Sequence, residues 1–170
     1  RSEIEHLIKD ALDDITFVII NTPAKTKLLK RYIELIELLN SHRDNPEGIK
    51  IPNVSLKSFL TIVGKTIQVD DSTKPFLYFE FLRYLNEILI EKLRDNQKIS
   101  KIFLDDVADF IEALTRESEN DEQELKIPVN LLDNSLIAAE IMDLITLLKL
   151  LGYGLDNVHS KVRSIDIQKY

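Results

Sequence analysis

The fold of this chain is decided by residues 135–152, which read SLIAAEIMDLITLLKLLG. Apolar side chains would cover nearly every side of a helix built from this stretch. Gly152 follows the last apolar residue, at a position where helices commonly end in a left-handed conformation. The apolar run is too short, and carries too many charged residues, to cross a bilayer. We therefore predict that these residues form a helix at the centre of the protein core.

A second stretch, residues 75–95, leads to the same architecture. At about 100° per residue, its charged side chains form a stripe over only about a third of the helix surface, so neighbours must cover the remainder. Capping signals and helical spacing predict four further helices, over about residues 2–20, 23–39, 55–67 and 100–115. The sequence therefore predicts an all-α fold with about six helices.

Two arrangements of these helices fit the pattern. The first is a compact bundle in which the other helices surround those at 75–95 and 135–151. The alternative is a short HEAT- or armadillo-like stack of helix hairpins. Two helices that are apolar nearly all round favour the bundle, because solenoid helices usually leave one side in water. We assign the bundle to residues 1–154 and treat residues 155–170 as a C-terminal tail that docks as an extended segment.

The composition excludes several classes of protein. The chain has no Cys, so it forms no disulfide and offers no thiolate as nucleophile or metal ligand. Its formal net charge of −7 argues against binding nucleic acid over the whole surface. No segment predicts a signal peptide or a membrane span. We expect an intracellular protein, in the cytoplasm or the nucleus, that does not bind membranes. Because the sequence begins with Arg1, we also expect it to be one domain of a longer chain.

The sequence contains no recognisable catalytic, cofactor or metal motif. The three histidines are predicted to lie at polar positions, and no two lie within four residues, so the short His spacings typical of metal motifs are absent: His6, His42 and His159. The segment Gly64-Lys65-Thr66 lacks the upstream Gly that a phosphate-binding loop requires. We therefore expect no enzymatic activity, no cofactor and no metal ion.

The helix predicted at residues 100–115 carries a cluster of carboxylates on the side away from its apolar face. The cluster consists of Asp105, Asp106, Asp109 and Glu112. Carboxylates at this spacing seldom hold a cation without a His or a carbonyl-rich loop beside them. Negative charge in the first half of a helix is also favoured by the helix dipole. We interpret the cluster as a solvated outer face.

The helix at residues 2–20 carries the candidate interface. Its apolar residues form one face that we expect to be buried: Ile4, Leu7, Ile8, Ala11, Ile15, Val18 and Ile19. Phe17 and Ile20 lie away from this face and make the last turn apolar on every side. Either a second layer of the same domain covers them, or they form an exposed patch that binds a partner.

These observations predict a non-catalytic protein–protein interaction domain, a scaffold or adaptor within a larger intracellular complex. Other protein subunits are its expected partners. Phe17 and Ile20 are the predicted partner-binding residues. This prediction rests mainly on the absence of the catalytic motifs considered above. The apolar last turn of the helix at residues 2–20 supports it directly.

The alternative function is a helical nucleic-acid-binding subunit of a nucleoprotein complex. Such a subunit would use the one dense group of basic residues in the sequence: Lys25, Lys27, Lys30 and Arg31. Glu34 and Glu37 continue the same face of the predicted helix, which favours a surface of mixed ion pairs. Nucleic acid is therefore the less favoured partner.

Overall fold

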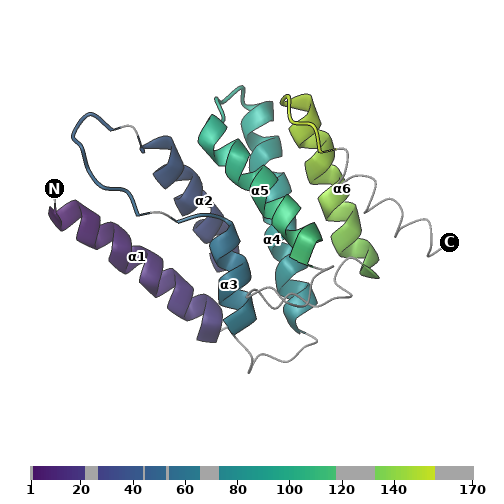
Figure 1. Ribbon diagram of the computed structural model, residues 1–170, viewed down its shortest axis with the longest axis horizontal. Helices are drawn as coiled ribbons and strands as arrows, with labels where there is room; N and C mark the ends of the chain where they lie inside the picture. The colour runs from purple at the N-terminus through teal and green to yellow at the C-terminus, as the bar shows by residue number, and fades with distance from the viewer. Residues whose placement is uncertain are drawn as a thin grey trace.

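The computed structural model describes residues 2–21, 27–43, 45–52, 54–65, 73–117 and 133–155 (Figure 1). Most of them belong to six helices: α1 (Ser2–Asn21), α2 (Lys27–Ser41), α3 (Lys57–Lys65), α4 (Thr73–Arg94), α5 (Lys101–Glu117) and α6 (Ser135–Leu150). No strand occurs among the described residues. The prediction of an all-α bundle of about six helices is confirmed.

The six helices are arranged in two rows (Figure 1). One row contains α1, α3 and α5, which run downwards in the view, and the other contains α2, α4 and α6, which run upwards. Packing within the rows joins α1 with α3, α3 with α5, α2 with α4, and α4 with α6. Consecutive helices run antiparallel in the order α1/α2, α3/α4 and α5/α6, which is also how the alternative architecture orders its helices, but most of the packing joins helices of the same row.

The central position of α4 explains its wide apolar surface. α2 packs on one side of α4 and α6 packs on the other. Eight apolar or aromatic residues of α4 are buried: Leu77, Tyr78, Phe81, Leu82, Tyr84, Leu85, Ile88 and Leu89. Glu80 belongs to the predicted charged stripe but is buried as well. Its carboxylate accepts a hydrogen bond from Arg83 at 2.7 Å, so the charge keeps a partner as it leaves water.

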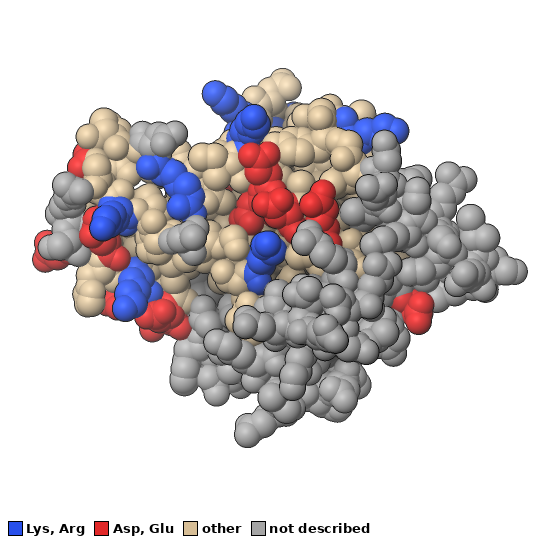
Figure 2. Space-filling view, in the orientation of Figure 1, with Lys and Arg blue, Asp and Glu red and all other residues tan. Residues whose placement is uncertain are grey.

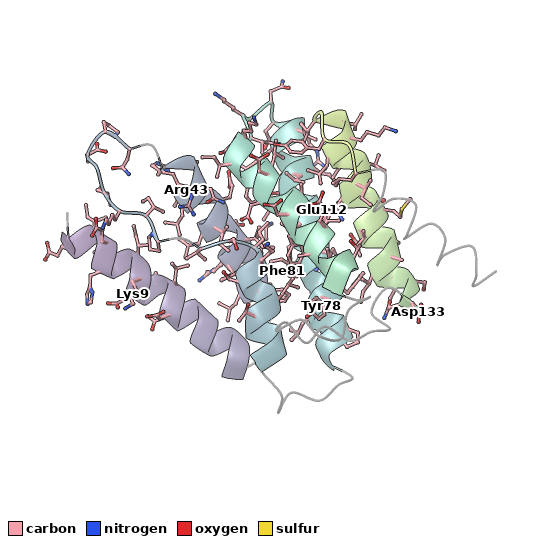
Figure 3. All side chains as sticks on the ribbon, viewed as in Figure 1. Lys9, Arg43, Tyr78, Phe81, Glu112 and Asp133 are labelled. Atoms are coloured by element: carbon pink, nitrogen blue, oxygen red, sulfur yellow. The ribbon has the colours of Figure 1, made fainter. Side chains whose placement is uncertain are left out.

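An aromatic cluster joins four helices at the centre of the core. The rings of Phe59 on α3 and Phe81 on α4 stack with their centroids 3.9 Å apart, and Tyr78 meets Phe59 edge-on at 5.8 Å. Phe110 of α5 and Tyr32 of α2 complete the cluster around Phe81, which is labelled together with Tyr78 in Figure 3. Aromatic pairs of this kind stabilise a fold beyond the area they bury. The cluster therefore ties α2, α3, α4 and α5 into one core.

Specific hydrogen bonds define both ends of α6. The side chain of Asn134 accepts bonds from two backbone N–H groups in the first turn, as an N-cap does. At the other end Gly152 has a φ of +96°, and the N–H of Tyr153 donates to the carbonyl of Leu148. This is the left-handed ending that the position of Gly152 predicts.

Among the described residues, α6 lies at one edge of the bundle and α4 lies at its centre. The sequence predicted a central position for both helices. The inner side of α6 is buried: Ile137, Ala138, Ile141, Leu144, Ile145 and Leu148. Leu136 and Leu150, by contrast, are 61% and 75% exposed. Leu155, where the predicted tail begins, is buried in the core. The rest of that tail, residues 156–170, lies outside the described residues.

Candidate functional site

The N-terminal half of α1 presents apolar side chains to solvent. Ile4 is 47% exposed, Leu7 is 66% exposed, and Ala11 is exposed as well. These three residues lie one turn apart along one side of the helix, and we call them the α1 stripe. The expectation that Ile4, Leu7 and Ala11 are buried is wrong. Leu12, which lies at the edge of the predicted apolar face, is buried instead.

A hydrogen bond is formed from the side of α1 that faces the rest of the protein. The carboxylate of Glu5 accepts the backbone N–H of Lys50 at 2.7 Å, so the side of α1 that carries Glu5 faces the rest of the protein. Glu5 and Ile8 are half-buried beside Leu12. At about 100° per residue, the side of the helix that carries Glu5, Ile8 and Leu12 is rotated by about 70° from the centre of the predicted apolar face. No pattern within α1 reveals this rotation, because the partner group belongs to a loop more than forty residues away.

Acidic side chains border the α1 stripe on its solvent side. Glu3, Asp10 and Asp14 are all exposed and follow Leu7 around the helix within about 60°. The sequence places no Lys or Arg in this arc of the helix. His6 lies beyond the carboxylates, with its Nε2 3.8 Å from Asp10. The surface thus combines a narrow apolar ridge with an acidic margin.

A further exposed apolar side chain lies on α2, the helix that packs against α1. Leu38 of α2 is 54% exposed. It lies in the C-terminal half of α2, which runs beside the N-terminal half of α1 because the two helices are antiparallel (Figure 1). The same end of the bundle therefore exposes large apolar side chains from two neighbouring helices.

The predicted partner-binding residues also belong to α1. Phe17 and Ile20 lie in the C-terminal part of this helix, and their side chains are outside the described residues. The choice between internal burial and an exposed patch at these two positions stays a prediction. The exposed apolar residues that the structure does describe, Ile4 and Leu7, lie in the other half of the same helix.

The basic cluster is partly engaged in ion pairs. Lys30 reaches α4, where its Nζ lies 3.2 Å from Glu87 and 3.5 Å from Glu91. The hydrogen bond with Glu87 raises the pKa of Lys30 above its ordinary value. Arg31 is exposed on α2. The side chains of the other two members, Lys25 and Lys27, lie outside the described residues.

A second pair of oppositely charged residues joins the same two helices. Lys92 of α4 lies 2.6 Å from Glu37 of α2, and both side chains are mostly buried. Glu37 is one of the two acidic residues that follow the basic cluster in the sequence. These ion pairs join α2 to α4 within one row and hold the two neighbouring helices together.

The acidic face of α5 differs most from its prediction at Asp106, and Glu112 is half-buried. Asp105 and Asp109 are exposed, and Figure 2 shows acidic side chains gathered over α5 in the middle of this view. Asp106, however, is only 9% exposed. Its carboxylate accepts the backbone N–H of Leu56 at 3.0 Å and the side-chain amide of Asn40 at 3.4 Å. The expectation that Asp106 is solvated is wrong, because its carboxylate is buried where it binds the backbone N–H group at the start of α3.

Burial raises the pKa of Asp106 above its ordinary value of 3.8, although the bonds from Leu56 and Asn40 act in the opposite direction. A carboxyl group with a raised pKa in a pocket is one mark of a catalytic acid or base. Asp106 lines a pocket of about 230 Å³ together with Asp105, Asp109 and Arg43. The lining contains no His or Lys to act with it. Both of its roles visible in the structure, capping α3 and binding Asn40, are structural.

Two further pockets open on the surface. One of about 430 Å³ lies between the end of α2 and the start of α5, and the other, of about 360 Å³, lies beneath α1. The described ranges contain no group of three or more His, Asp or Glu side chains arranged to hold a metal ion. None of the helices in the described part of the chain is long and apolar enough to span a membrane.

We compared the chain with protein-family models, with curated proteins and with solved structures, and none of the three comparisons found a significant match.

Proposed function

We propose that this protein is a non-catalytic interaction domain, a scaffold or adaptor within a larger intracellular complex, and that it binds other protein subunits through the outer side of α1. The observation that carries this proposal is the exposure of Ile4 and Leu7 on one side of one helix. Apolar side chains scattered singly over a surface are common and need no partner. A row of them along a helix, rimmed by charged residues, is typical of a binding surface.

The proposal is consistent with the apolar content of α1. A helix on the surface of a domain usually turns its whole apolar arc towards the core. In α1 part of that arc is left in water, at a cost in hydrophobic burial. A partner that covers Ile4 and Leu7 would recover that burial. An intracellular setting is supported by the complete absence of Cys from the sequence.

Phe17 and Ile20 are proposed as a second, separate binding patch on the same helix. At about 100° per residue these positions lie about 100° and 160° around α1 from the stripe, about two turns or more beyond Ala11. A nucleic-acid-binding subunit remains the alternative function, and it would use Lys25, Lys27 and Arg31, since Lys30 already pairs with two carboxylates. A gel-shift assay at low and moderate salt separates this alternative, because binding through phosphates weakens steeply as salt rises.

Affinity capture with paired variants tests the proposal. The wild type, Leu7→Asp and Leu136→Asp are used as baits in an extract of the native cell, and bound proteins are quantified by mass spectrometry. Leu136 is the matched control, because it is a similarly exposed Leu on α6 at the opposite end of the bundle. We expect Leu7→Asp to lose partners that Leu136→Asp retains, while both variants keep the wild-type thermal transition. Equal capture by all three baits would contradict binding through α1.

The same assay applies to Phe17 and Ile20. A double change of these residues to Asp should abolish capture and leave the fold intact if they belong to the binding surface. Unfolding or aggregation of this variant would show that both side chains are part of the core. In that case Leu7→Asp alone decides whether α1 binds a partner.

A further inference from the structure

We infer that the α1 stripe takes an amphipathic helix of a partner protein, and that basic residues flank the apolar ridge of that helix. This inference rests on the proposed function and specifies the chemistry of the partner. It follows from the α1 stripe (Ile4, Leu7 and Ala11) and from the charges beside it.

The shape of the surface fits a helix. Ile4, Leu7 and Ala11 lie on one side of α1 and span about 10 Å of its axis at about 1.5 Å per residue. A straight apolar ridge of this length matches the ridge of a second helix that packs alongside, with apolar residues at i, i+3 or i+4, and i+7. Leu38 of α2 is a further exposed apolar side chain at the same end of the bundle.

The charge of the surface selects a basic partner. Glu3, Asp10 and Asp14 form an acidic margin along the stripe, and no Lys or Arg lies in the same arc of the sequence. A helix packed on Leu7 would place its own flanking side chains over these carboxylates. Lys or Arg at those positions would be attracted, whereas Asp or Glu would be repelled.

The same margin argues against a second copy of this chain as the occupant. Two α1 helices packed through their stripes would bring six carboxylates of Glu3, Asp10 and Asp14 to one interface. The net charge of −7 on each copy would add a longer-range repulsion. A partner with the opposite charge is therefore favoured over self-association.

Selection from an unbiased peptide library tests the inference. Phage that display random 16-residue peptides are selected on the wild-type protein and depleted on Leu7→Asp. We expect enrichment of sequences with apolar residues at helical spacing and Lys or Arg beside them. Synthetic peptides made from these sequences should bind Leu7→Asp at least about tenfold more weakly than the wild type, and should bind the Leu136→Asp control with unchanged affinity.

A charge variant isolates the contribution of the acidic margin. The triple change Glu3→Gln, Asp10→Asn and Asp14→Asn should weaken binding of the selected peptides at least about fivefold, and added salt should weaken binding to the wild type in the same direction. The change Asp105→Asn with Asp109→Asn, on the acidic face of α5, is the control and should leave affinity unchanged. A stronger effect of the α5 change would place the basic peptide on α5 and overturn the inference.

The remaining outcomes also decide the question. Enriched peptides that depend on Leu7 but carry acidic or uncharged flanks would overturn the basic partner and leave the proposed interaction function standing. Failure to enrich any helical sequence would overturn the helix-binding surface. Sedimentation that shows a dimer in the wild type and a monomer in Leu7→Asp would identify a second copy as the occupant. Equal capture of native partners by the wild type and Leu7→Asp would instead contradict the proposed function itself.

Discussion

The carboxylate of Asp106 on α5 accepts the backbone N–H of Leu56 at the start of α3, at 3.0 Å and across 50 residues of sequence. The first N–H groups of a helix have no partner within the helix itself. A side chain from a different helix supplies one here. Asp106 is held in turn by Asn40 of α2, whose side-chain oxygen accepts a bond from Arg43 at 2.9 Å. Three helices thus meet at one buried carboxylate.

Removal of this carboxylate should destabilise the fold. Asp106→Ala leaves the N–H of Leu56 buried without its partner, and an unsatisfied buried donor costs about 1–3 kcal/mol. We expect urea denaturation to show a fall of this size in the free energy of unfolding. Asp109→Ala, one turn further along the same helix and exposed, is the control and should change it by less than about 0.5 kcal/mol. Equal effects of the two substitutions would show that the cap contributes nothing.

The raised pKa of Asp106 predicts a specific dependence on pH. In the folded protein this carboxyl keeps its proton to a higher pH than in the unfolded chain, because burial disfavours its charged form. The wild type should therefore lose stability relative to Asp106→Asn as the pH rises from about 4 through the raised pKa, and the difference should then stay constant. Urea titrations of both proteins from about pH 3.5 to 7.5 measure the difference. A difference that moves in the opposite direction would mean that the hydrogen bonds outweigh burial.

The hydroxyl of Tyr78 provides a contrasting prediction. This oxygen is buried, and among the described residues it has no hydrogen-bond partner. Burial alone raises its pKa above the ordinary value. Tyr78→Phe removes an unsatisfied polar group and keeps the ring against Phe59, so it should leave stability unchanged or raise it by about 1 kcal/mol. Differential scanning calorimetry measures the shift.

Tyr32 is the matched control for Tyr78. It belongs to the same aromatic cluster and is equally buried, but its hydroxyl forms a hydrogen bond with Ser58. Tyr32→Phe should therefore lower stability by about 1 kcal/mol. Equal effects of the two substitutions on stability would contradict the difference in hydrogen bonding between the two hydroxyl groups.

Leu144 on the inner side of α6 should be a major contributor to stability. Its side chain is fully buried, so Leu144→Ala should leave a cavity and cost about 2–5 kcal/mol. Leu150→Ala, in the exposed last turn of the same helix, should cost much less. The midpoints of urea unfolding compare the two variants. An unchanged midpoint for Leu144→Ala would show that α6 contributes little to the core.

Local signals in the sequence account for most of the fold. Periodic apolar residues and the turn at Gly152 are properties of short segments, and they locate the helices to within a few residues. The environments of Asp106 and Leu7 could not be predicted in the same way. Asp106 is buried beside Leu56 at the start of α3, and Leu7 is exposed on a helix whose Glu5 side faces the loop at Lys50. Both causes join segments distant in sequence, so no local pattern contains them.

The two-row arrangement has a consequence for how the chain folds and how it tolerates a cut. Packing within each row joins helices that are not consecutive, such as α2 with α4 and α4 with α6. Native contacts of this kind lie far apart in sequence, so we expect slower folding than in a bundle whose consecutive helices pair, since each contact must first close a long loop. Two consecutive helices on their own would also lack the neighbouring helices that bury their apolar faces. We therefore expect α6 to stay bound to the rest of the protein after a protease cuts the connection between α5 and α6, because α6 packs on α4.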